Sequence, residues 1–474
     1  MSSSTDASNT PNTSRSHNAV SSDRPDIAHT PIEPSNDATS PMLPSEKPTA
    51  LRASPASFLH MPRNVYLLYF FTLGKGFQLT IAMLNISYYA HSLGYKPDFI
   101  GLLNAMGAIG ALIGAVPVGF LADRFGRKPM LILSAILTPL FLALVGLVTS
   151  APLLLVFSLI QGTVSTAYWV TNIPLLTEST TERQRVGVLA MNTFLLLGVG
   201  AFGNLLGGAI PELVAGILHV SAASTVPLRW GVMLAALITL VFGLPLWLLQ
   251  EPRRRQGRDE AGANEQGKIV PQRTRTRFPV AAFLKLLVPD LVFTMGEGAV
   301  VALMQLYFVL RFHLLPGPLG VIFTISGIVG GIFSLTAPLF ANRWGKLRLI
   351  TVVQYISAPL MLLIGFAPTL PLAVTGEYTR SFLRTLIDPV YAAFAMENVS
   401  SQYRARLSGL YSVTWSIGFS VGPAIAGWLQ TNISLSTSFV FGAACLLVAP
   451  TLLLLFFGKR GHNNAAKEEA SRAF

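Results

Sequence analysis

The pentapeptide Ala122-Asp123-Arg124-Phe125-Gly126 has a close copy, Ala341-Asn342-Arg343-Trp344-Gly345, that follows it by 219 residues. The same offset carries Glu178 onto Glu397. A chain that repeats itself at a fixed offset is built from two structurally equivalent units. In membrane chains, such repeats are typical of transporters whose binding site lies between the two units.

Composition assigns the chain to the membrane. Only 12% of its 474 residues are charged, against about 25% in an average soluble protein. Apolar runs of about 20 residues, enough to cross a bilayer as a helix, recur along the chain. Because backbone polar groups in lipid must be satisfied internally, these runs are predicted to be helices. The predicted spans are 65–90, 99–122, 129–149, 152–177, 186–210, 230–249, 283–312, 317–340, 347–366, 371–396, 406–429 and 435–457. The predicted fold is therefore an all-α membrane protein, with twelve transmembrane helices in two six-helix pseudo-symmetric halves.

Basic residues are unequally divided between the two sets of loops. If the first helix starts inside, the inner loops hold eighteen Lys and Arg residues and the outer loops hold three, Lys96, Arg229 and Arg311. By the positive-inside rule both termini are predicted to be cytoplasmic. The net charge of +12 is explained by this asymmetry, and no basic face on a soluble domain suggests a nucleic-acid partner.

Five segments follow from the pattern. Residues 1–60 are polar and poor in aliphatic side chains, and are predicted to be a disordered cytoplasmic tail. Residues 61–250 form the N-terminal six-helix half, 251–280 a basic cytoplasmic linker, 281–458 the C-terminal six-helix half, and 459–474 a second cytoplasmic tail.

The loop between the second and third predicted helices reads Gly119-Phe120-Leu121-Ala122-Asp123-Arg124-Phe125-Gly126-Arg127-Lys128. This stretch resembles the G-x-L-A-D-R-x-G-R-K loop signature of the major facilitator superfamily. The resemblance implies that the loop latches the cytoplasmic side shut when the cavity faces outward. Small residues allow close approach of helix backbones, which is the role expected of the first glycine. The gating residues it implies are Gly119, Asp123, Arg124, Gly126 and Arg127; the alternative is a plain basic turn with a fixed salt bridge.

Among branches of this family, the chain looks most like the drug:proton antiporters. Their fifth helix carries a G-P-x-x-G-G core, which here reads Gly203-Asn204-Leu205-Leu206-Gly207-Gly208. Asn204 therefore stands where the antiporters have proline.

Charged residues inside the predicted spans are Lys75, Glu297, Glu377, Arg380, Arg384 and Asp388. Each costs about 3 kcal/mol at the bilayer centre, so they are expected to be paired or hydrated. They fall on the first, seventh and tenth helices, and the resemblance implies that these helices and the fourth line the central cavity. Polar side chains spaced three or four residues apart extend this set. The predicted substrate cavity comprises Lys75, Gln78, Asn85, Tyr89, Ser158, Gln161, Ser165, Tyr168, Asn172, Met304, Tyr307, Glu377, Arg380, Arg384 and Tyr391.

Two interpretations of these charges remain open. In the functional one, Lys75, Arg380 and Arg384 bind an anionic or polar substrate and Glu297 carries the coupling proton, because desolvation penalises the charged form of a carboxyl group. In the other, the charges neutralise one another. The possible pairs are Glu377–Arg380, Arg384–Asp388 and, across the two halves, Lys75–Glu297.

The predicted function is secondary active transport by alternating access. The chain has no Walker signature, no metal-ligand cluster and no nucleophile constellation, so no enzyme activity, cofactor or metal is expected. We expect a monomer in the plasma membrane, the bacterial inner membrane or its equivalent, with the lipid bilayer, a small-molecule substrate and protons as partners.

A wet aromatic cavity favours proton-coupled export of small amphipathic molecules. The aromatic set is Tyr88, Tyr89, Tyr168, Trp169, Tyr307, Tyr391 and Trp415. The alternatives are proton-coupled uptake of an anionic or polar metabolite, and a membrane receptor or scaffold that transports nothing.

Overall fold

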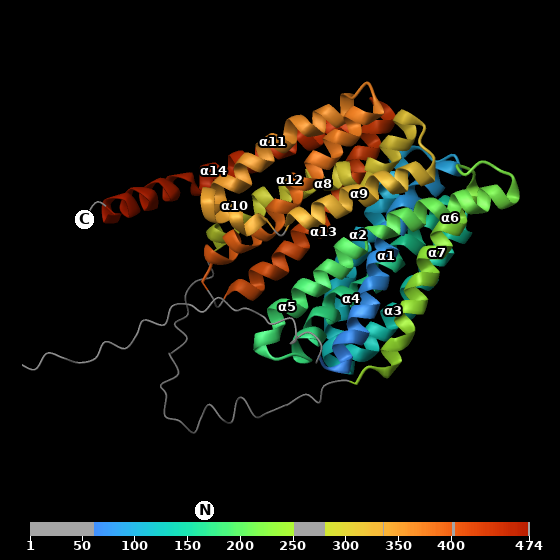
Figure 1. Cartoon of the computed structure of the whole chain (residues 1–474), viewed down its shortest axis with the longest axis horizontal. Helices are drawn as coiled ribbons and strands as arrows, with labels where there is room; N and C mark the ends of the chain where they lie inside the picture. The colour runs from blue at the N-terminus through green and yellow to red at the C-terminus, as the bar shows by residue number, and fades with distance from the viewer. Residues whose placement is uncertain (1–60, 251–279, 335, 401–402, 473–474) are drawn as a thin grey trace, which may run out of the picture. The chain divides into compact units, whose positions relative to one another are not determined.

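The computed structural model of the chain describes residues 61–250, 280–334, 336–400 and 403–472. Within these ranges the regular secondary structure is helical throughout (Figure 1). The helices are α1 (Arg63–Ser92), α2 (Pro97–Phe125), α3 (Arg127–Leu147), α4 (Ala151–Glu178), α5 (Glu182–Thr193), α6 (Phe202–Leu218), α7 (Thr225–Gly243), α8 (Val280–Phe312), α9 (Pro316–Ser334), α10 (Ala337–Trp344), α11 (Lys346–Phe366), α12 (Leu370–Glu397), α13 (Arg404–Asn432) and α14 (Thr437–Arg472).

The predicted membrane fold is confirmed. Among the described residues, ten helical stretches are long and apolar enough to cross a bilayer. The other two predicted spans are helices as well, α12 with 28 residues and α13 with 29. At about 1.5 Å per residue both can span the hydrocarbon core. Charged residues in α12, and serine and glycine residues in α13, explain why composition alone does not select them.

Two predicted helices are interrupted. The span at 186–210 consists of α5, a π-helical segment at Phe194–Val199 and α6. The span at 317–340 consists of α9 and the short α10. A π-helical segment inserts an extra residue into a helical turn, so a periodicity that assumes a continuous α-helix does not detect it.

The sequence repeat has a direct counterpart in the structure. An ion pair joins Arg127 to Glu178, and another joins Lys346 to Glu397. Each partner of the first pair lies 219 residues before its counterpart in the second. We call the ends of the helices where these pairs lie the basic end.

Glycine is required at the turn that precedes each of these basic residues. Gly126 has φ 97° and Gly345 has φ 79°. Side chains other than glycine adopt such angles only with strain. The same glycine turn therefore occurs in both halves, while the gating role of Gly126 stays a prediction.

The N-terminal half (α1–α7) and the C-terminal half (α8–α14) are joined by hydrogen bonds at the end opposite the basic end. There α2 packs against α13, and α6 packs against α9. The bonds run from Tyr88 Oη to Leu314 O (3.1 Å), from Asp98 N to Thr431 Oγ1 (2.9 Å) and from Gly317 N to Glu212 Oε1 (3.0 Å).

Glycines show that the α2–α13 contact is close at only one end. A Cβ atom on Gly101 or Gly427 would collide with the backbone of the opposing helix, whereas one on Gly119 or Gly409 would meet nothing within 4 Å. The close contact predicted for Gly119 belongs to the state in which the cavity faces outward, and in this arrangement α2 and α13 are apart at that glycine. The structure is closed at the opposite end and open at the basic end.

Burial is inverted relative to a soluble protein. Large apolar side chains lie on the outside, such as Val116 and Ile217 with 80% and 76% of their surface exposed. The ionisable side chains of Lys75, Glu297 and Arg380 are buried. A surface of this kind requires lipid as its solvent, which agrees with the membrane assignment.

The terminal and linker predictions are only partly covered by the structure. The predicted tail 1–60 lies outside the described residues, as does the predicted linker 251–280 except for its last residue. The predicted tail 459–474 begins inside α14, which continues as helix to Arg472 although its apolar stretch ends at Gly458. Alanine, lysine and glutamate, which favour helix, recur in this extension.

The packing of Gly101 provides a stability test. We expect Gly101→Val to lower the free energy of unfolding by about 1–3 kcal/mol, the usual cost of overpacking. Gly216→Val is the matched control, because a Cβ there would meet nothing within 4 Å. The measurement is the thermal midpoint of each variant in nanodiscs. Equal shifts in the two variants would contradict the close contact.

Candidate functional site

Buried charges from α8 and α12 form one network in the C-terminal half. Arg380 Nη1 donates to Glu297 Oε2 at 3.1 Å. Arg380 also binds Glu377 with two parallel bonds, Nε to Oε2 at 2.9 Å and Nη2 to Oε1 at 3.2 Å. Arg384 Nε forms an ion pair with Glu297 Oε2 at 3.0 Å. Ser326 of α9 donates a further hydrogen bond to Glu377 Oε1 at 3.4 Å. The network therefore contains two carboxylates and two guanidinium groups, and its charges balance.

Arg384 is the loosely held member of this network. Its Nε–H is not aligned for a hydrogen bond to Glu297, so the contact is an ion pair only. Its side chain is 30% exposed, whereas those of Glu297, Glu377 and Arg380 are buried. Arg384 can therefore move or change partner at a lower cost than Arg380, which has two carboxylate partners.

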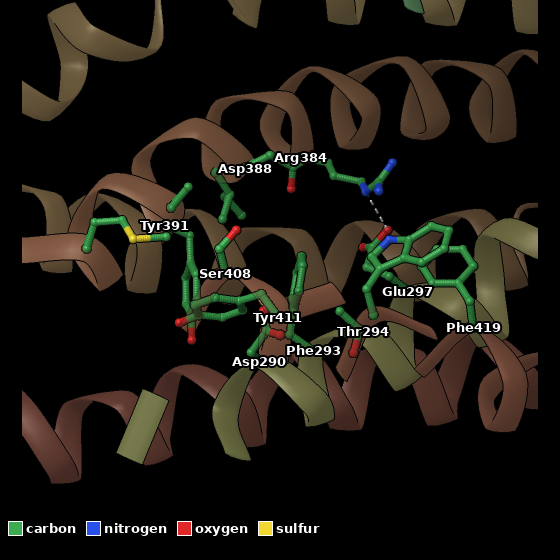
Figure 2. Close-up of a pocket in the computed structure, with 14 residues that line it drawn as sticks. Asp290, Phe293, Thr294, Glu297, Arg384, Asp388, Tyr391, Ser408, Tyr411 and Phe419 are labelled. Atoms are coloured by element: carbon green, nitrogen blue, oxygen red, sulfur yellow. Dashed lines mark ion pairs between the residues drawn. The ribbon is translucent and has the colours of Figure 1, made fainter. Parts of the chain in front are cut away.

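The structure decides between the predicted charge pairs. The Glu377–Arg380 pair is present. Arg384 contacts Glu297 instead of Asp388, because its side chain reaches across to α8 (Figure 2). Glu297 is bound by the two arginines, so the predicted pair across the two halves, Lys75–Glu297, is absent in this arrangement.

Lys75 is buried on α1 among neutral groups. Its Nζ donates to Gln78 Oε1 at 2.7 Å and to Ser165 Oγ at 3.2 Å. The ring of Tyr168 lies 5.5 Å from the same atom. The predicted association of Gln78, Ser165 and Tyr168 with Lys75 is therefore found, but it lies in the N-terminal half, away from the arginines.

Several residues predicted to line the cavity connect helices instead. Their polar atoms are bonded to backbone carbonyl groups: Asn85 to Ile81 and Gly207, Tyr89 to Val148, Ser158 to Leu103, and Tyr307 to Ile364 and Gly365. Met304 is buried in the apolar core. The helical spacing of these residues was read correctly, but a polar side chain on an inner face can bind a neighbouring helix as well as a cavity.

A second cluster of neutral polar side chains lies in the N-terminal half. Asn172 Nδ2 donates to Asn192 Oδ1 at 3.0 Å, and Thr72 Oγ1 donates to the same oxygen at 2.8 Å. Tyr168 Oη donates to Thr72 Oγ1 at 3.2 Å. Gln161, predicted on the same stripe of α4, is half-buried. Thr72, Tyr168, Asn172 and Asn192 are buried, and among their polar atoms Asn172 Oδ1 has no hydrogen-bond partner in the structure.

The C-terminal half contains a cavity of about 270 Å³ between α8, α12 and α13. In Figure 2, Arg384 and Asp388 lie next to each other along α12, with Glu297 toward one end of the cavity and Tyr391 and Asp290 toward the other. Its lining residues are Asp290, Phe293, Thr294, Glu297, Arg384, Ile387, Asp388, Tyr391, Ala392, Met396, Ser408, Tyr411, Trp415 and Phe419. Of the predicted substrate residues, Arg384 and Tyr391 line it, together with the predicted proton carrier Glu297.

Two signals for this cavity were present in the sequence but not used in the prediction. Asp290 is an acidic residue inside the predicted span 283–312 and was omitted from the charged set. Tyr411, Trp415 and Phe419 recur every four residues, which places them on one face of α13. Of the predicted aromatic set, Tyr391 and Trp415 are among the lining residues.

The predicted gating residues lie at the basic end. Arg127 is paired with Glu178 of α4. The guanidinium of Arg124 lies 5.6 Å from the ring of Phe125, and the side chains of Asp123 and Arg124 are exposed. The Arg127–Glu178 pair therefore connects the loop to α4 of its own half.

The chain belongs to the major facilitator superfamily, whose family model matches residues 67–377 and 380–473. It is 27% identical to multidrug resistance protein 2 of Bacillus subtilis over 381 residues, covering 77% of this chain and 88% of that protein. It is 25% identical to the gentisate transporter of Corynebacterium glutamicum over 418 residues, covering 82% and 86% of the two chains. It is also 26% identical to the shikimate transporter of Escherichia coli over 371 residues, covering 72% and 81%.

Solved structures confirm the fold. A bacterial homologue of the human lysosomal transporter Spinster superimposes with a TM-score of 0.65 at 15% identity, covering 85% of this chain and 96% of that one. The D-xylose–proton symporter gives a TM-score of 0.65 at 14% identity, covering 83% and 97%. The chain is thus a multi-pass membrane transporter.

The buried network yields a stability prediction. Arg380→Met strands Glu377 and weakens the pairing of Glu297, and the loss of one partner from a buried ion pair costs about 3–5 kcal/mol. The double variant Arg380→Met/Glu377→Met removes the stranded charge and leaves Glu297 with Arg384, so it should be the more stable of the two. Unfolding midpoints in nanodiscs provide the comparison. Lys346→Met, which breaks an exposed pair, should cost less than about 1 kcal/mol. A double variant less stable than Arg380→Met would refute the pairing scheme.

Proposed function

We propose that the protein is a secondary active transporter that uses protons to export small amphipathic organic molecules. One observation carries the proposal: an aromatic cavity opens beside a charge-balanced network whose central member is the carboxylate Glu297. The similarity to a protein named for multidrug resistance supports the same direction of transport. Both halves belong to one chain, so the transporting unit is a monomer. Gradient-driven transport needs no catalytic group, cofactor or metal.

The orientation follows from charge. If the basic end faces the cytoplasm, as the positive-inside rule requires, the structure is inward-facing. An exporter in this state collects its substrate from the cytoplasm or the inner leaflet. Alternating access then requires the α2–α13 and α6–α9 contacts to open at the opposite end while the basic end closes. In that second state, Gly119 and the loop of Asp123 would form the close contact that this structure lacks.

Glu297 is suited to couple protons to this movement. Its Oε2 atom holds both Arg380 and Arg384. When a proton binds to Glu297, the negative charge that both arginines share disappears. Arg384 has the weaker attachment and is released first, which changes the charge of the cavity that it lines. Protonation and substrate binding are thereby linked.

The test is transport by purified protein in proteoliposomes. Glu297→Gln should abolish uptake driven by a pH gradient, because the side chain no longer binds or releases a proton, while substrate exchange without a gradient survives. Glu212→Gln is the control, since its amide oxygen can still accept the hydrogen bond from Gly317 N. Gradient-driven transport by Glu297→Gln at the parent rate would rule out the coupling role.

A second candidate function is proton-coupled uptake of an anionic or polar metabolite. Arg384 favours it, because this residue lines the cavity, is partly exposed and uses only Nε in its ion pair. Guanidinium groups bind carboxylates with two parallel hydrogen bonds, which ammonium groups cannot reproduce. Relatives named for gentisate and shikimate transport support this alternative.

Arg384→Lys distinguishes the two candidates. If the substrate is anionic, the substitution should weaken binding by about 2 kcal/mol, the scale of a hydrogen bond to a charged group. If the substrate is an amphipathic molecule without an anionic group, binding should change little, because lysine keeps the charge that faces Glu297. Thermal shift of the purified protein across a panel of drugs and carboxylates measures both outcomes.

A further inference from the structure

The cavity of the C-terminal half has an excess of negative charge. Its lining contains three carboxylates, Asp290, Glu297 and Asp388, and one guanidinium, Arg384. The pairing of Glu297 with Arg384 leaves Asp290 and Asp388. Neither has an ion-pair partner in the part of the chain that the structure describes. They lie close enough to interact electrostatically with each other.

The buried arginines do not compensate these two acids. Arg380 is bound by Glu377 and Glu297, so its charge is already balanced within the network. Asp290 accepts a hydrogen bond from Thr414 Oγ1, an uncharged group, at 2.5 Å. Arg384 interacts electrostatically with Asp388 but is already paired with Glu297, so one cation serves three carboxylates. This excess of negative charge in a partly dry site is costly, and a positively charged ligand would reduce the cost.

The remaining lining is suited to the apolar part of such a ligand. Trp415 and Phe419 stack with ring centroids 4.5 Å apart, and Tyr391 and Tyr411 meet edge to face at 5.8 Å. Aromatic faces attract cations, and most strongly when water is excluded. Tyr391 and Tyr411 both belong to the lining of the cavity, so this edge-to-face pair contributes to its aromatic surface.

The other half shows that this arrangement is not required by the fold. Adding 219 carries Asn172 onto Tyr391 and Asn192 onto Tyr411. In the N-terminal half these two asparagines are buried and hydrogen-bonded to each other. The same offset places Trp169 at the position of Asp388. The residues that line the cavity at these three positions are thus not repeated in the N-terminal half.

We propose that this cavity binds organic cations, with Asp290 and Asp388 as the counter-ions and Tyr411, Trp415 and Phe419 as the surface for the apolar group. The proposal rests on the proposed transport function and narrows its substrate class to amphipathic molecules that carry a positive charge. Arg384 and Glu297 border the site without adding net charge to it.

The test is equilibrium binding to the full-length protein in nanodiscs, without a pH gradient. Three probes of similar size separate charge from shape: phenyltrimethylammonium, its neutral isostere tert-butylbenzene, and benzoate. We expect the cation to bind at least about tenfold more tightly than the neutral isostere, the factor that corresponds to one contact to a charged group. Binding of benzoate or tert-butylbenzene as tight as that of the cation would overturn the proposal, and this comparison needs no variant.

Two variants locate the site. Asp290→Asn and Asp388→Asn should each weaken phenyltrimethylammonium binding by about tenfold or more. Asp98→Asn makes the same chemical change outside the cavity, and asparagine can still accept the hydrogen bond from Phe99 N, so affinity should be unchanged. If the cation binds equally well to the folded Asp388→Asn variant and to the parent, the site is not this cavity. Asp388 is exposed, so its substitution should not impair folding.

Failure of the site and failure of the transport function give different results. Tight cation binding without transport in proteoliposomes would keep the site and refute the exporter. Gradient-driven transport of neutral or anionic molecules, without cation binding, would keep the transporter and refute the site.

Discussion

The carboxylate of Glu297 holds the centre of the C-terminal half together, because it is the one group that α8 offers to both arginines of α12. Buried ions are tolerated in a bilayer only when they are paired, and Arg380 obtains its second partner from its own helix, Glu377. The positions of α8 and α12 relative to each other therefore depend on charge balance as well as on packing. Any event that neutralises Glu297 changes this balance, and the proton coupling proposed above would depend on this change.

Most of the fold could be predicted from the sequence. Apolar runs, basic loops and the repeat of Ala122–Gly126 at Ala341–Gly345 are local signals of a physical requirement, since helices must satisfy their backbone in lipid. The interruptions at Phe194–Val199 and between α9 and α10 could not be predicted in this way. They change the hydrogen-bond register of a helix without changing its apolar character.

The candidate site could be predicted only in part. Helical spacing identified inner faces correctly, and Glu297, Arg380 and Arg384 are members of one network. Spacing cannot say whether a polar group on an inner face meets a cavity or a neighbouring carbonyl group. Asn85 and Tyr307, which were predicted to line the cavity, bind carbonyl groups of neighbouring helices in this structure. The choice of Glu297 over Asp388 as the partner of Arg384 depends on the distance between two helices that are far apart in the sequence.

The cavity is enclosed by α8, α12 and α13, all of which belong to one half. A molecule bound there contacts only that half and moves with it. When the two halves rock, its contacts need not be broken and remade, because the walls that touch it move together. What changes is the position of the N-terminal half, which would move away from the cavity at one side of the membrane and toward it at the other. The affinity of such a ligand can then be nearly the same on both sides of the membrane, and in the function proposed above the proton gradient would set the direction of net transport.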